Sequence, residues 1–136
     1  MLPLTKTQCF ENECCTLALD PDVGCLIFSW KGLLPSKGFR EVHLQALSQI
    51  RKHRITKVLT DARRMKTIGS TDADWMVSFW LPSAIAAGYR YNAVIESDYL
   101  FNQESLTGII NKTDQAQVTF RNFKDEESAL FWLKHC

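Results

Sequence analysis

The residues of this chain best suited to bind an anion follow a short apolar strand at residues 57–61. That strand ends on Asp61, and a basic loop containing Arg63 and Arg64 leads to a helix that begins near Thr71. Guanidinium groups and the free amides of a helix N-terminus both bind phosphate groups well. The same residues would form an ordinary solvated loop if Asp61 paired with an arginine or capped the backbone. The spacing therefore predicts either an anion site or a local ion pair at this junction.

A stripe of aromatic side chains on the next helix offers a second kind of binding chemistry. Trp75, Phe79 and Trp80 lie close together, and Pro82 follows within the same helix. Because proline removes a backbone hydrogen bond and crowds the preceding turn, we expect a kink or break near Trp80. The stripe then has three interpretations: the wall of a pocket for an apolar ligand, a hot spot for a protein partner, or ordinary core packing.

The other polar residues form no catalytic or metal-binding pattern. His43, His53 and His135 are scattered over two helices that lie far apart in the sequence. The chain contains no HExxH or CxxC spacing, no glycine-rich phosphate loop, and no nucleophile with a base beside it. We therefore predict a protein that is not an enzyme and that uses no cofactor or metal.

Cysteine usage and the N-terminus indicate where the protein works. The five cysteines are an odd number in a chain too long to need disulfides, which favours a reducing compartment. Residues 1–6 contain neither a basic segment nor an apolar segment of the secretory kind. We predict a cytoplasmic protein whose cysteines are structural.

Length and composition exclude several classes of protein. With 136 residues, 46% of them apolar and 23% charged, the chain fits one ordinary globular domain spanning residues 1–136. A net charge of +1 gives no electrostatic reason to bind nucleic acid. No apolar run approaches the roughly 20 residues that a membrane-spanning helix needs. We therefore predict neither a nucleic-acid partner nor a membrane span.

Hydrophobic periodicity predicts the elements that must position these residues. The strands are expected at residues 9–20, 25–30, 57–61, 91–96 and 116–121, and the helices at residues 37–53, 72–87, 102–111 and 124–135. The second of these helices has a capping pattern in which Thr71 accepts from the amide of Asp74. The order β-β-α-β-α-β-α-β-α predicts an α/β fold with an N-terminal antiparallel hairpin, a mixed, mostly parallel five-stranded sheet and helices on one face. Since the central strands look apolar on both sides, the uncovered face predicts a homodimer.

Five short segments together resemble a known group of bacterial domains. They are residues 26–32, 58–63, 74–75 with 80–82, 93–95 and 129–133. Together they resemble the STAS-like fold of the anti-sigma-factor antagonists, a β-α superhelix related in architecture to CRAL-TRIO lipid-binding domains. The resemblance implies a role in binding or regulation and no catalytic residues. In those antagonists a phosphorylated serine follows the third strand; Ser70 and Thr71 are the nearest candidates here, after a longer and more basic loop.

Two functions from different classes are consistent with these observations. The first is a non-enzymatic regulatory or protein-interaction domain that binds a protein partner, or itself, through residues 63–70 and the start of the following helix. The second is a carrier of a small apolar ligand or lipid in a pocket near that helix. The residues predicted to bind the partner or ligand are Asp61, Arg63, Arg64, Ser70, Thr71, Trp75, Phe79 and Trp80.

Overall fold

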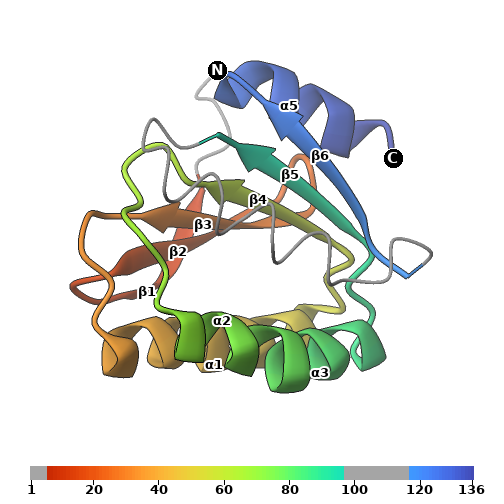
Figure 1. Ribbon diagram of the computed structural model, residues 1–136. Helices are drawn as coiled ribbons and strands as arrows, with labels where there is room; N and C mark the ends of the chain where they lie inside the picture. Colours follow the sequence, from red (N-terminus) through yellow and green to blue (C-terminus); the bar gives the residue numbers. More distant parts are fainter. Residues whose placement is uncertain (1–5, 97–116) are drawn as a thin grey trace.

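A six-stranded mixed sheet forms the centre of the protein, as the computed structural model shows for residues 6–96 and 117–136 (Figure 1). The strands are β1 (Thr7–Glu11), β2 (Cys15–Asp20), β3 (Cys25–Trp30), β4 (Lys57–Asp61), β5 (Tyr91–Ile95) and β6 (Thr119–Phe123). They lie side by side in chain order. The first three strands pair antiparallel, and β3 to β6 pair parallel. The predicted α/β class, with an antiparallel start and a parallel remainder, is confirmed.

The strand count is six in the described part of the chain, because the segment predicted as one strand at residues 9–20 is divided in two. Asn12 lies at the division, and its side-chain oxygen accepts hydrogen bonds from the backbone amides of Cys14 and Cys15. Such a side-chain turn competes with strand pairing and reverses the chain. The helix predicted at residues 102–111 lies outside the described residues.

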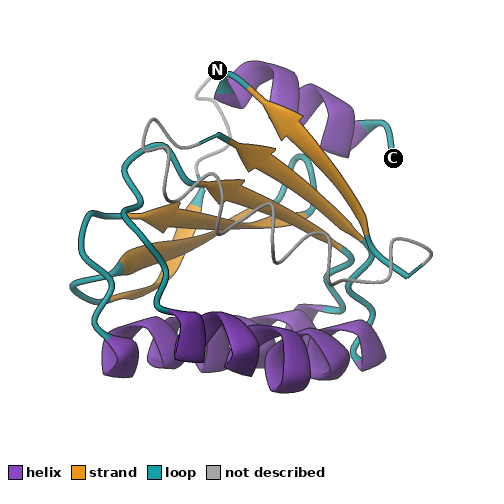
Figure 2. Ribbon diagram, viewed as in Figure 1, coloured by secondary structure: helices purple, strands orange, loops and turns teal. Residues whose placement is uncertain are grey.

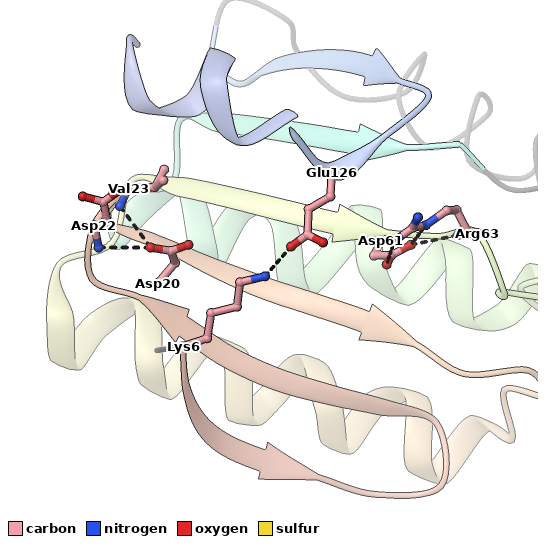
Figure 3. Close-up of polar contacts among 7 residues, drawn as sticks. All are labelled: Lys6, Asp20, Asp22, Val23, Asp61, Arg63 and Glu126. Carbon is pink, nitrogen blue, oxygen red and sulfur yellow. Dashed lines mark hydrogen bonds and ion pairs between the residues drawn. The ribbon is translucent and has the colours of Figure 1, made fainter. Parts of the chain in front are cut away.

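The turn between β2 and β3 forms at residues 21–24, as predicted from its sequence. Asp20 accepts hydrogen bonds at its Oδ1 atom from the amides of Asp22 and Val23 (Figure 3). Gly24 closes the turn with φ of +76°, a backbone conformation that glycine adopts without strain. This local hydrogen bonding fixes the register in which β2 and β3 pair.

One face of the sheet is covered by α1 (Ser36–His53) and by a second helical segment (Figure 2). The second segment consists of α2 (Ser70–Trp75), a π-helical turn η1 (Met76–Trp80) and α3 (Leu81–Ala86). The apolar stripe of α1 packs against the inward residues of β2, β3 and β4 and forms the larger core.

The predicted break before Pro82 takes the form of the π-helical turn η1. Proline has no amide hydrogen, so it cannot complete the usual helical hydrogen bond. The amide of Leu81, immediately before it, donates to the carbonyl of Met76, five residues back. The helical segment therefore runs on through Pro82 with one widened turn.

The prediction that every helix lies on one face is corrected by α5 (Glu126–Lys134), which packs on the opposite face (Figure 1). Ala129 and Leu133 of α5 contact a second buried cluster that contains Ile27, Leu59 and Ala93. The physical reason is the double-sided apolar character of β3 to β5, since the alternate residues of a strand point to opposite faces. Because α5 covers part of the face that was expected to be open, less apolar surface remains there for a second copy of the chain to cover.

An ion pair between Lys6 and Glu126 joins the start of the chain to the first turn of α5 (Figure 3). No helix in the described residues combines the length and apolarity needed to cross a membrane.

Candidate functional site

The structure divides the residues predicted to form one site among separate places. The first is the carboxyl end of β4, where Asp61 lies two residues after Leu59 and so faces the α5 side of the sheet. The helical segment that carries the aromatic residues covers the other side. The acidic and basic residues at this junction and the aromatic stripe therefore do not converge.

Asp61 pairs with Arg63 through two side-chain hydrogen bonds (Figure 3). Arg63 donates from Nε to Oδ1 over 3.0 Å and from its terminal nitrogen to Oδ2 over 2.8 Å. Its backbone amide also donates to Oδ1 over 3.2 Å. Burial opposes ionisation of Asp61, but the hydrogen bonds from Arg63 outweigh it and lower the pKa of the carboxyl group. The local ion pair, one of the two interpretations of this sequence, is present.

A polar groove of about 430 Å³ lies beside this pair. Thr16, Ser29 and Lys31 line it together with the arginines. Lys31 is paired with Glu11 at 2.6 Å. Arg64 is exposed and forms no ion pair with any described residue. Most of the positive charge here is therefore already matched by carboxylates, which weakens the groove as an anion site.

Ser70 and Thr71 open α2 and are both exposed. The predicted capping by Thr71 is wrong, because no side chain caps this helix, whose N-cap is Gly69. The helix start is held instead by Asp72, which is 6% exposed. Its Oδ1 atom accepts from Ser36 Oγ over 2.6 Å and from Arg40 Nε over 3.0 Å, and these contacts tie α2 to α1.

Trp75 and Phe79 form a stacked aromatic pair at the surface of the helix layer. Their ring centroids lie 5.5 Å apart, and Phe79 is 45% exposed. The guanidinium of Arg40 lies 5.2 Å from the Trp75 ring, within the range of a cation–π interaction. Since Asp72 also holds Arg40, the guanidinium has a fixed position beside the rings. We call these three side chains the Arg40–Trp75–Phe79 surface.

Trp80, next in sequence to Phe79, points the other way and is 2% exposed. Its indole nitrogen donates to the backbone oxygen of His43. Phe28 contacts it edge-on, with ring centroids 6.2 Å apart. Trp80 therefore belongs to the core, and it lines a cavity between the helix layer and the sheet.

His43 is a buried residue of this cavity that the sequence did not single out as functional. It is 3% exposed and is surrounded by the rings of Phe28, Trp30, Phe39, Trp75 and Trp80 at centroid distances of 4.5 to 6.0 Å. Burial lowers the pKa of His43 to about 4, so the imidazole is neutral at neutral pH.

A chain of hydrogen bonds crosses the sheet side of the same cavity. Thr60 Oγ1 donates to Asn92 Oδ1 over 3.0 Å, and Asn92 Nδ2 donates to the Tyr89 hydroxyl over 2.7 Å. Burial raises the pKa of Tyr89, so the hydroxyl keeps its hydrogen. A sequence signal for these residues existed, because His43 and Asn92 occupy core-facing positions in an apolar helix stripe and an apolar strand.

No group of three or more histidine, cysteine or acidic side chains within residues 6–96 and 117–136 is arranged to hold a metal ion. Comparisons of the chain with protein-family models and with curated proteins found no match.

Proposed function

We propose that this chain is a non-enzymatic, STAS-like protein-interaction domain that binds a protein partner through the Arg40–Trp75–Phe79 surface. The observation that supports the proposal is the stacked, half-exposed aromatic pair with a guanidinium fixed beside it. Tryptophan, tyrosine and arginine are the residues most enriched at the energetic centres of protein interfaces.

Preorganisation strengthens the case for this surface. A long arginine side chain loses conformational entropy when a partner immobilises it. Here Arg40 is already held by the Asp72 carboxylate on one side and by the Trp75 ring on the other. A partner would therefore find the cation in place, and more of the contact energy would appear as affinity.

A regulatory role is part of the same proposal. Thr71 is exposed and precedes Trp75 by four residues, which places it one helical turn away on the same side of the segment. A phosphate on Thr71 would add negative charge beside the proposed surface and so change its complementarity to a partner. The cytoplasm is the proposed compartment, and the absence of a disulfide among the five cysteines is consistent with it.

Site-specific photo-crosslinking tests the proposal. Phe79 is replaced by benzoylphenylalanine, and the purified protein is irradiated in an extract of the cells that produce it. Phe131 is the matched control, since it is an exposed phenylalanine, 67% accessible, on α5 at the other face of the sheet. We expect a discrete product from position 79 that position 131 does not give. Trp75→Ala in the position-79 protein should reduce its yield about tenfold or more, because truncating a hot-spot side chain costs at least about 2 kcal/mol.

The mass of the crosslinked product identifies the partner. A product of twice the chain mass would make a second copy of this protein the partner, as the predicted homodimer requires. The same pattern of products from both positions, or no product from position 79, would refute the proposed surface. Circular dichroism of each variant confirms that it remains folded.

The cavity bears on the alternative function, the carrier of an apolar ligand or lipid. Its volume is about 50 Å³. A cavity of about 150 Å³ accommodates a benzene ring, so an acyl chain would require the helix layer to move away from the sheet. We therefore favour partner binding over lipid transport.

A further inference from the structure

The cavity beneath η1 contains buried polar atoms whose hydrogen bonding is incomplete. Its walls come from the inward faces of α1, β3, β4, β5 and the η1 segment, and we call it the His43 cavity. The aromatic rings of Phe28, Trp30 and Trp80 form much of its apolar surface. No lysine, arginine, aspartate or glutamate is among its described lining residues. A charged ligand would therefore find no counter-charge there, which favours a neutral one.

The first buried atom with an unused hydrogen-bonding position is Nε2 of His43. Nδ1 lies 2.9 Å from the carbonyl oxygen of Phe39. A carbonyl only accepts, so Nδ1 must be the donor, and the neutral ring then carries a lone pair on Nε2. Within residues 6–96 and 117–136, no donor lies within hydrogen-bonding distance of Nε2. His43 thus presents an unused acceptor while its ring is 3% exposed.

The second is the hydroxyl group of Tyr89, whose hydrogen is not donated to any described residue although the residue is only 1% exposed. The hydroxyl oxygen accepts from Asn92 Nδ2, so its own hydrogen remains to be donated. No described residue accepts from Tyr89. Buried polar groups are nearly always satisfied in native proteins, so a donor and an acceptor left open around one cavity indicate an occupant.

We infer that the His43 cavity binds a small neutral molecule with a hydroxyl group, which donates to His43 Nε2 and accepts from the Tyr89 hydroxyl while its carbon atoms contact the aromatic wall. A hydroxyl group supplies both a donor and an acceptor, as the two open atoms require. The cavity volume of about 50 Å³ exceeds the roughly 10–15 Å³ that one water molecule needs. It is smaller than the cavity of about 150 Å³ that holds a benzene ring. A short-chain alcohol is therefore the ligand class.

A pair of isomeric ligands tests the inference directly. Ethanol and dimethyl ether have the same atoms and similar size, but only the alcohol can donate a hydrogen bond. Binding is followed by thermal shift and by the ¹⁵N resonance of His43 Nε2, which moves when that nitrogen accepts a hydrogen bond. We expect ethanol to bind the wild-type protein about tenfold more tightly than dimethyl ether, the value of one buried hydrogen bond of about 1.4 kcal/mol.

Two variants show whether the discrimination comes from these residues. His43→Phe keeps an aromatic ring in the cage but removes the acceptor, so the two ligands should bind it with similar affinity. Tyr89→Phe removes the open donor and should weaken the binding of both ligands, because both contain an acceptor oxygen. Thermal unfolding of each variant confirms that the core is intact.

Three results would overturn the inference. They are equal affinities of the two isomers for the wild-type protein, unchanged discrimination in His43→Phe, and an Nε2 resonance that neither ligand moves. The last result would mean that the cavity holds water only. The test is independent of the proposed partner surface, because it uses purified protein and residues that are not part of that surface.

Discussion

Acidification should destabilise this protein through His43 before its carboxylates titrate. The pKa of His43 is lowered from 6.5 to about 4 in the folded state, while the unfolded chain keeps the ordinary value. Between these two values the unfolded chain binds a proton that the folded protein does not. Stability is therefore intact above pH 6.5, falls as the pH decreases toward 4, and becomes constant in this respect below 4.

The expected loss follows from the size of the shift. One pH unit in this window is equivalent to about 1.4 kcal/mol, so the loss between pH 7 and pH 5 is about 2 kcal/mol and the full loss about 3 kcal/mol. His43 is 3% exposed, so solvent screening reduces these values little. Urea denaturation at several pH values, followed by tryptophan fluorescence, measures the free energy of unfolding directly.

His43→Phe is the control that isolates this residue. His53 and His135 are present in both proteins, so their contributions cancel in the comparison. We expect the decrease in unfolding free energy between pH 7 and pH 5 to be smaller in the variant by about 2 kcal/mol. Parallel pH profiles for the two proteins would refute the assignment of His43 as a buried, neutral imidazole.

Three further predictions test the packing of the two layers by urea denaturation. Asp72→Ala should cost about 2–4 kcal/mol, because it leaves the guanidinium of Arg40 and the hydroxyl of Ser36 without their acceptor. A cost below about 1 kcal/mol would contradict the proposed link between α1 and α2. Gly38→Ala should cost about 1–3 kcal/mol, because the added Cβ would lie 2.7 Å from the sulfur of the buried Cys14. Its control is Gly32→Ala, which should change stability by less than about 0.5 kcal/mol because the added Cβ meets nothing within 4 Å. Leu133→Ala should cost about 2–4 kcal/mol and Phe131→Ala less than 1 kcal/mol, and equal effects would show that α5 does not pack as described.

Features that depend on neighbouring residues were predictable from the sequence. The turn at residues 21–24 formed as expected because Asp20 bonds to amides two and three residues away. The helix expected at residues 37–53 matches α1, Ser36–His53, because its apolar stripe is long and regular. The strand expected at residues 116–121 is displaced and observed as Thr119–Phe123, a small error typical of element ends.

Features that depend on distant partners were not predictable. The capping pattern of Thr71 with Asp74 was plausible locally. The helix start is held instead by Asp72, which accepts hydrogen bonds from Arg40 and Ser36, 32 and 36 positions earlier in the chain. The position of α5 depends on which face of β3 to β5 remained open, and an apolar stripe alone does not reveal its destination. His43 was overlooked for the same reason, since its aromatic surroundings come from β3, α1 and the η1 segment.

The π-helical turn sets the rotational phase of everything that follows it. In an unbroken α-helix, the side that carries Asp72 would return at Phe79, since two turns span about seven residues. The buried position is instead Trp80, one residue later, because the widened turn accommodates one extra residue. Deleting Ser78 would remove this extra residue, so that a regular helix would carry Trp80 at the seventh position after Asp72 and keep it on the buried side. An unbroken α-helix of the unaltered sequence would instead turn Phe79 into the core and Trp80 toward the solvent.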